Sequence, residues 1–203
     1  AADRGHRGVD AQRRVRLKAD LAAAHTDWDE AQMHLQELDL LVEHAFPRAF
    51  RGGFVVILWG TFEAGVAEIA RGLAAHRELR LKLRDLRGDD FIDLTSKYFE
   101  AILHLTLFEE PRDVAAISDL LKVRNGFAHG NGRLAALNEQ TSWAVDSVVR
   151  KNVGVSVDWG NIVLGAAFCE TSFVAVDRCL RSIVNRARKA RRISSTDPAS
   201  PQA

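Results

Sequence analysis

The amino-acid sequence predicts an all-α protein, an up-down bundle of about five helices with one small β-hairpin near residues 153–164. Three observations lead to this prediction. Apolar residues recur at three- and four-residue intervals along most of the chain. Alanine, leucine and arginine are abundant, whereas there are only 4 prolines and 1 tyrosine. A chain of 203 residues, 47% of them apolar, is long enough for one domain with a real core.

The first part of the chain contains two predicted helices. Residues 1–10 carry little apolar pattern, and we expect them to be flexible. From about Ala11 to Ala45 the pattern is helical and strongly charged, and Pro47 with the pair Gly52-Gly53 then predicts a break. Residues 54–76 form the most hydrophobic helix, whose broad apolar surface predicts a central, buried position. The apolar stripe late in the first helix consists of Leu35, Leu38, Leu41 and Val42.

The segment that follows the central helix is basic. Residues 77–88 contain five arginines and lysines and show only a weak apolar pattern. Asp89 or Asp90 is suited to cap the next helix, because an aspartate side chain accepts hydrogen bonds from the first free amides. We expect that helix to extend to about Phe108.

The next two helices are separated by a glycine-rich loop. Pro111 fits the first turn of a helix that extends to His129, since the missing prolyl N–H has no helical partner there. Glycine is typical just beyond a helix end, so Gly130 and Gly132 are expected to stop this helix. A further helical pattern covers residues 134–150.

The last part of the chain changes period and then returns to it. Apolar residues alternate in 153–164 and residues 158–161 have turn composition, which predicts a hairpin. A final helix is expected over 166–192, followed by a disordered Ser/Pro-rich tail at 193–203.

Composition excludes several classes of function. The net charge is only +1, so affinity for nucleic acid would have to come from a local patch. Cys169 and Cys179 would lie about 15 Å apart on one helix, too far for a disulfide. The 7 histidines show no metal-ligand spacing, so neither a metal nor a cofactor is expected. The longest apolar run, Phe54 to Trp59, is too short to span a bilayer, which predicts a soluble cytoplasmic protein without a membrane partner.

The most informative motif is Arg124-Asn125-Gly126-Phe127-Ala128-His129. A guanidinium can bind a phosphate through two parallel hydrogen bonds. An imidazole can transfer a proton near neutral pH. The spacing by itself is weak evidence, because Arg71 and His76 repeat it in the central helix.

The context of the motif favours a site. Asn125 and His129 share one helix face, and the loop Gly130-Asn131-Gly132 lets a substrate approach the backbone. Glu63 in the central helix needs a cationic partner if it is buried, and Arg124 is a candidate for that pair. A structural role stays open, because cations are favourable at a helix C-terminus and Glu63 could serve only the bundle interior.

The motif resembles the signature of the HEPN superfamily (higher eukaryote and prokaryote nucleotide-binding domains). Arg124, Asn125 and His129 match its Arg-Asn-x3-His pattern, and the segment 58–65 is similar to the aromatic–Glu segment of one bacterial branch. Glu63 matches the acidic position of that branch. The resemblance covers roughly residues 35–190 and implies that residues 11–192 form a HEPN-like helical domain.

The resemblance implies a metal-independent endoribonuclease. Many members of the family act as toxins or phage-defence effectors, and they dimerise so that two motifs face one cleft. By this resemblance Arg124, Asn125 and His129 would be catalytic, with Glu63 and Asn131 in supporting roles. Some toxin members carry a modifiable tyrosine where this chain has Asn131. RNA, a second copy, and an antitoxin or defence protein are the expected partners. The alternative is a non-catalytic HEPN-like module that binds RNA, a nucleotide or a protein.

A second candidate site is the basic end of the last predicted helix. Five cations within seven residues could bind an RNA backbone, or could form a solvated helix end favoured by the helix dipole. The five residues predicted to bind RNA are Arg186, Arg188, Lys189, Arg191 and Arg192.

Overall fold

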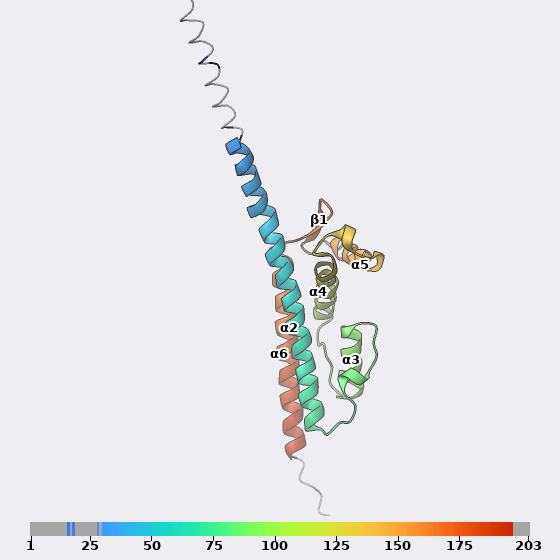
Figure 1. The fold of residues 1–203 in the computed structure, drawn as a ribbon. Helices are drawn as coiled ribbons and strands as arrows, with labels where there is room; N and C mark the ends of the chain where they lie inside the picture. Colours follow the sequence, from blue (N-terminus) through green and yellow to red (C-terminus); the bar gives the residue numbers. More distant parts are fainter. Residues whose placement is uncertain (1–15, 17, 19–27, 29, 197–203) are drawn as a thin grey trace, which may run out of the picture. The chain divides into compact units, whose positions relative to one another are not determined.

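The computed structural model describes residues 16, 18, 28 and 30–196, without the side chains of Glu43 and of residues 191–196. The segment predicted to be flexible, residues 1–10, and the tail from residue 197 lie outside the described residues. The chain divides into two units, Ala1–Pro47 and Arg48–Ala203. The second unit is mostly helical, with packed helices and a small antiparallel hairpin, which confirms the predicted fold class (Figure 1).

The first unit is helical in its described part. Residues 30–40 form α-helix, and a π-helical turn follows at Leu41–Ala45. The predicted apolar stripe is exposed: Leu35, Leu38, Leu41 and Val42 contact no core within this unit.

Helix α2, Phe46–His76, contradicts the predicted break. It continues through both Pro47 and Gly52-Gly53. Pro47 lies in the first turn of α2 and directly follows the widened π turn, where a missing N–H donor is tolerated. Gly52 lies within the helix and has no room for a side chain, because a Cβ there would come within 2.4 Å of the Phe127 ring.

Three helices form the frame of the second unit: α2, α4 (Pro111–Gly130) and α6 (Ala166–Thr196). Helix α6 runs parallel to α2, because Arg51 donates to the Leu164 carbonyl at 2.7 Å and Gly65 packs against Leu180 farther along both helices. Helix α4 runs antiparallel to both, since Gly52 meets the C-terminal end of α4 at Phe127 (Figure 1).

Helix α3, Phe91–Ala101, is shorter than predicted. Asp90 caps it as expected and accepts from the Asp93 amide at 2.9 Å. The helix does not reach Phe108, because the carbonyls of Leu103 and Leu107 are bound by side chains of other elements and the segment packs into the core. A 3-10 turn at Leu83–Asp85 precedes α3.

The predicted helix 134–150 is two elements. A 3-10 turn covers Leu134–Ala136, and α5 covers Glu139–Val149. The division is local: Asn138 has extended backbone, and its side chain accepts from the Thr141 amide at 2.8 Å, so the helix begins after it.

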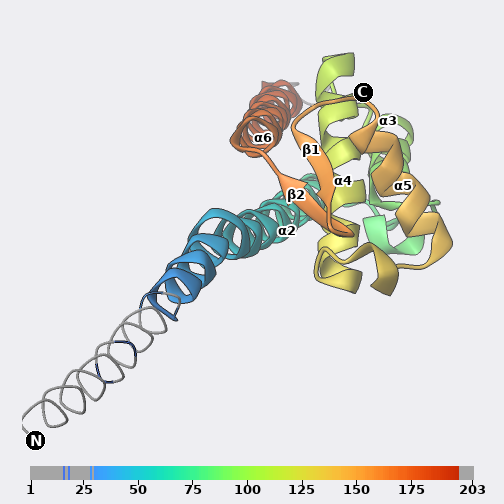
Figure 2. The same ribbon diagram turned by 90° about the horizontal axis from the view of Figure 1, so that it is seen from above.

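The hairpin is present where it was predicted. Strands β1 (Val155–Asp158) and β2 (Asn161–Leu164) pair antiparallel with Asp158 opposite Asn161. Trp159 and Gly160 form the two-residue turn with φ of 47° and 72°, the left-handed backbone that a tight hairpin requires. Figure 2 shows the hairpin between α6 and α5, over α4. Helix α6 continues to Thr196, past the predicted end at Arg192.

The core combines one side of α2 with α3 to α6 and the hairpin. The core confirms that α2 is central, but only 33% of the most apolar 18-residue stretch of α2 is buried. By length and composition alone this helix could also cross a membrane. The largest fully buried side chains include those of Trp59, Phe62, Tyr98, Phe99 and Leu120.

Candidate functional site

The motif residues occupy the last two turns of α4. Arg124 is half-buried, and its Nη1 donates to Oδ1 of Asn125 at 2.9 Å. The Arg124 Nε has no hydrogen-bond partner. Among the described residues, it is the one buried side-chain nitrogen or oxygen without a partner. A buried N–H without an acceptor is costly, so this guanidinium is oriented by Asn125 and still has an unfilled donor.

The glycines of the motif allow α4 to pack closely. A Cβ on Gly126 would come within 2.6 Å of Ile162, and one on Gly130 within 2.5 Å of Leu137. These contacts seat the end of α4 against β2 and the segment before α5. Close packing therefore holds the helix end that carries the motif in place, as a precisely positioned site requires.

Asn131 ends the helix. The sequence predicted glycine stops, but the residue that leaves the helix with left-handed backbone is Asn131, with φ of 50°. Its amide donates to the Phe127 carbonyl at 2.9 Å, and the Gly132 amide donates to the Gly126 carbonyl at 3.2 Å. Asparagine tolerates this backbone better than other residues with a Cβ, so Asn131 has a structural role that needs no substrate.

The motif side chains lie on two neighbouring faces of α4. Asn125 and His129 share one face, as predicted, and the His129 side chain is exposed. Arg124 shares the next face with Ala128 and Asn131, which is turned toward α2. Arg124 and His129 are five residues apart, so helix geometry separates them by about 140° around the axis and roughly 7.5 Å along it.

A groove of about 390 Å³ lies beside the end of the motif. It separates the first turns of α2 from the end of α4, with Phe127, Ala128 and Asn131 on the α4 side. Arg48 lines the α2 side and forms no ion pair among the described residues. The sequence analysis missed Arg48, because only the antiparallel packing of α2 and α4 brings it to the motif.

The predicted ion pair between Glu63 and Arg124 is wrong. Glu63 is half-buried and forms no ion pair in the described part of the chain. The packing of Gly52 on Phe127 explains why Glu63 and Arg124 do not meet. Because α4 runs antiparallel to α2, Arg124 lies opposite residues near Val56, about two turns of α2 before Glu63. Glu63 shares a face of α2 with Gly52 and Val56, so its separation from Arg124 is along the helix axis.

The basic end of α6 is also remote from the motif. Arg188 shares a surface hollow with Gly72, whereas the motif packs at Gly52, so roughly 30 Å of α2 separates the two. Arg186 is only 19% exposed; it donates to the Leu107 carbonyl at 3.2 Å and pairs with Glu109 at 3.4 Å. Arg188 and Lys189 are exposed, and the side chains of Arg191 and Arg192 lie outside the described part.

Other reactive groups are few among the described residues. These residues contain no cluster of three His, Cys, Asp or Glu side chains suited to a metal ion. Cys169 and Cys179 are both free thiols. Burial raises the pKa of Cys179 to about 12, and its thiol donates to the Leu107 carbonyl, so it is a packing residue rather than a nucleophile.

In comparisons with known proteins, no family model, curated protein or solved structure matches the chain.

Proposed function

We propose that the protein is a metal-independent endoribonuclease of the HEPN type. The observation that carries this proposal is the state of Arg124, a guanidinium oriented by Asn125 with a buried donor left unpaired, on the helix end that exposes His129. A phosphate is the anion that a guanidinium fits best. Two further cations, Arg48 and the exposed Arg133, would attract an RNA backbone to the same end of the unit.

The proposed chemistry uses only these side chains. Arg124 would neutralise the scissile phosphate and the charge that grows on it, an effect typically worth about 10²–10³ in rate. His129 would take the proton from the ribose 2′-OH as this oxygen attacks phosphorus. The bond to the 5′ oxygen then breaks, and the leaving oxygen takes a proton from a second imidazole. The products would be a 2′,3′-cyclic phosphate and a 5′-OH end.

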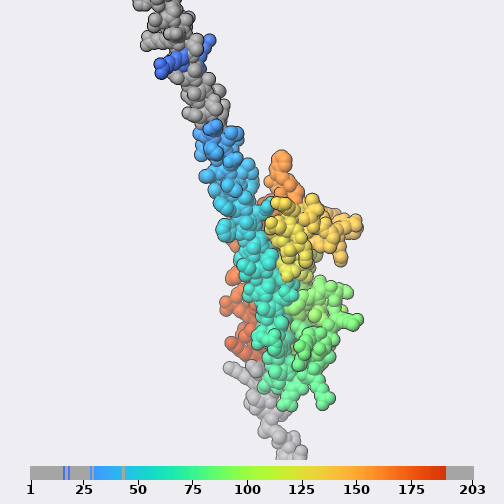
Figure 3. All heavy atoms as spheres, in the orientation of Figure 1, coloured from blue at the N-terminus to red at the C-terminus, as the bar shows by residue number. Residues whose placement is uncertain are grey.

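The need for two imidazoles is met by a homodimer, because one copy supplies one His129. The outer face of α2 supports this part of the proposal. Phe50 is 75% exposed and Ile57 is 70% exposed, and the helical spacing places Phe54 between them on the same face. Figure 3 shows that α2 lies at the surface of the second unit. Gly53 on this face has no neighbour within 4 Å of a Cβ position, so another helix could approach closely. Gly53 and Ile57 also line the groove beside the motif, so a second copy seated there would bring two motifs together.

The wider role would be that of a toxin or phage-defence effector in the cytoplasm. The exposed leucines of residues 30–42 support a protein partner, an antitoxin or a defence protein, because an uncovered apolar stripe is unstable in water.

The decisive experiment is RNA cleavage in EDTA by the wild-type protein and the variants Arg124→Ala and His129→Ala. We expect cleavage to persist in EDTA with the wild type and to fall by about 10²–10⁴ in each variant. Analysis of the new ends should find 2′,3′-cyclic phosphate and 5′-OH. The mass of the active species, measured by analytical ultracentrifugation, should be that of a dimer.

The matched control is His76→Ala, since His76 is also an exposed histidine in the last turn of a long helix and belongs to the repeated Arg-His spacing. It should cleave like the wild type. Ends carrying 3′-OH and 5′-phosphate would contradict the mechanism. Intact tRNA, mRNA and rRNA after incubation with the wild type would leave the non-catalytic HEPN-like binding module as the function.

A further inference from the structure

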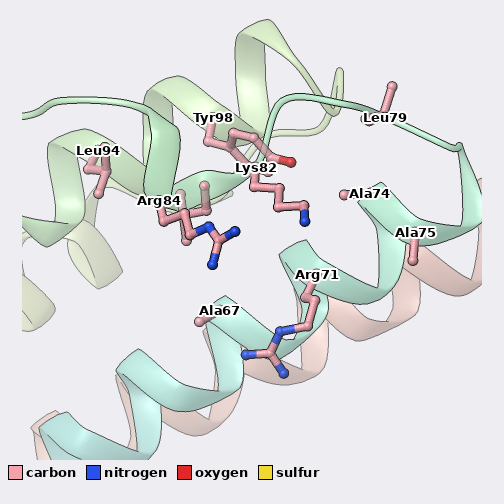
Figure 4. Close-up of a pocket in the computed structure, with 10 residues that line it drawn as sticks. Ala67, Arg71, Ala74, Ala75, Leu79, Lys82, Arg84, Leu94 and Tyr98 are labelled. Atoms are coloured by element: carbon pink, nitrogen blue, oxygen red, sulfur yellow. The ribbon is translucent and has the colours of Figure 1, made fainter.

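A second cavity lies far from the motif and is not used by the proposed function. It measures about 580 Å³ and is enclosed by the C-terminal half of α2, the connection 77–90 and α3 (Figure 4). Its nearest wall on α2 begins at Ala67, whereas the motif packs at Gly52, so the two sites are more than 20 Å apart along the helix. The volume falls within the range of small-molecule sites.

The floor of this cavity is apolar, and apart from three cations the Tyr98 hydroxyl is the polar side-chain group among its lining residues. Alanines 67, 74 and 75 hollow out the α2 wall, and Leu79, Leu83 and Leu94 cover the other side. Tyr98 is fully buried, and its hydroxyl already donates to the Leu81 carbonyl at 2.9 Å. A nucleobase or a sugar would therefore lose its hydrogen bonds on entering, whereas an aliphatic chain would lose none.

The rim of the cavity is cationic. Lys82 and Arg84 bring their charged ends into the space between the connection and α2, whereas the Arg71 guanidinium, paired with Glu68, points away from them along α2 (Figure 4). No carboxylate lines the cavity. Arg71 is paired with the exposed Glu68, and Arg84 lies 3.9 Å from Asp85, whose carboxylate also accepts from the Lys82 amide. Exposed pairs of this kind are weak and yield to a better anion. The Lys82 ammonium forms no ion pair among the described residues.

We propose that this cavity binds a single-chain amphipathic anion, an aliphatic chain that ends in a carboxylate or phosphate group. The chain would lie on the alanine and leucine floor, where burial of apolar surface supplies the affinity. The head group would lie between Lys82 and Arg84, which fixes the orientation of the ligand.

The test is isothermal titration calorimetry on the full chain with octyl phosphate and octanoate. Both should bind, whereas 1-octanol, which lacks the charge, and inorganic phosphate, which lacks the chain, should bind at least tenfold more weakly. Lys82→Gln should weaken octyl phosphate by roughly tenfold. Ala67→Phe, which fills the floor, should abolish binding. Arg87→Gln is the matched control, because Arg87 is exposed on the same connection and does not line the cavity.

Three outcomes would overturn the proposal. Equal affinity for 1-octanol would exclude recognition by the cations. Displacement of octyl phosphate by uridine monophosphate would indicate a nucleotide site instead. Lys82-dependent sedimentation with anionic phospholipid vesicles, without binding of soluble octyl phosphate, would indicate a membrane headgroup. None of these results depends on RNA cleavage, so this proposal and the proposed function fail separately.

Discussion

The two ends of the second unit differ in how their loops are held. The motif end has long-range backbone hydrogen bonds, with Arg51 as an additional side-chain donor, whereas the long-range hydrogen bonds of the opposite end come from side chains. Near the motif, the Ile162 amide donates to the Gly132 carbonyl at 2.7 Å, and the Leu134 amide donates to the Gly160 carbonyl at 2.9 Å. At the other end, the Arg77 side chain donates to the Leu103 carbonyl at 2.6 Å. Tyr98 donates to the Leu81 carbonyl at 2.9 Å, and Arg186 donates to the Leu107 carbonyl at 3.2 Å.

The difference explains which changes each end tolerates. Backbone hydrogen bonds and glycine contacts survive the loss of most side chains, but they fail when a Cβ is added. Loops held by single side chains respond in the opposite way, since each truncation removes a hydrogen-bond donor from a carbonyl of the loop. The second arrangement also leaves room between the elements, and the cationic cavity lies there. A closely packed end suits a fixed catalytic geometry, whereas a braced end suits ligand entry.

The largest expected change in stability comes from disrupting the glycine packing at the motif end. Gly52→Ala should lower the free energy of unfolding by about 1–2 kcal/mol, because a Cβ 2.4 Å from the Phe127 ring costs more than the helix gains from alanine. Gly53→Ala is the adjacent control with open space, and it should raise the free energy of unfolding by roughly 0.5–1 kcal/mol. Urea unfolding of both variants measures the difference. Equal stability of the two would show that the ring moves aside without cost.

The next effect separates the arginines of α6. Arg186→Ala should cost about 1–2 kcal/mol, since the Leu107 carbonyl loses its guanidinium donor. Arg188→Ala should change stability by less than about 0.5 kcal/mol, because this side chain is exposed. The sequence also predicts that Arg188 binds RNA. If it does, Arg188→Ala should reduce the salt dependence of RNA affinity, whatever its effect on stability. If Arg186→Ala is as stable as the wild type, the hydrogen bond from Arg186 to the Leu107 carbonyl does not stabilise this end of the unit.

The smallest effect concerns Tyr98. Tyr98→Phe should cost about 1 kcal/mol, because it removes the donor to the Leu81 carbonyl. Burial, and to a lesser degree the charge of Asp85, raises the pKa of Tyr98 above its ordinary value of 10.0. The neutral form is therefore favoured in the fold, so its contribution is complete below pH 10.0 and is lost as the pH rises through the folded-state pKa.

The chain has 1 tyrosine, so tyrosinate absorbance reports on Tyr98 alone. Its midpoint should lie above 10.0 in the native protein and return toward that value in urea. The same midpoint in both states would mean that the hydroxyl is solvated in the fold.

Local signals predicted the elements whose boundaries are set by neighbouring residues. Pro111 at the start of α4 and the hairpin with its turn at 158–161 were predicted correctly, and the cap of α3 is Asp90, one of the two aspartates that the sequence offered. Caps and tight turns depend on short-range hydrogen bonds and backbone angles, so the sequence contains the information. The position of the motif at the end of α4 followed from the same signals.

Tertiary contacts decided the rest. Gly52 lies inside α2 rather than at a break, and the Phe127 ring of α4 fills the space that a side chain there would need. The last predicted turns of α3 are absent because Arg77 and Arg186 bind the carbonyls of that segment. The antiparallel offset of α2 and α4 separates Glu63 from Arg124 and brings Arg48 to the motif instead. The sequence by itself determined the starts of α3 and α4 and the turn of the hairpin, because those depend on near neighbours. Only the packing decided which residues meet, because partners distant in the chain are chosen by the fit of whole helix faces.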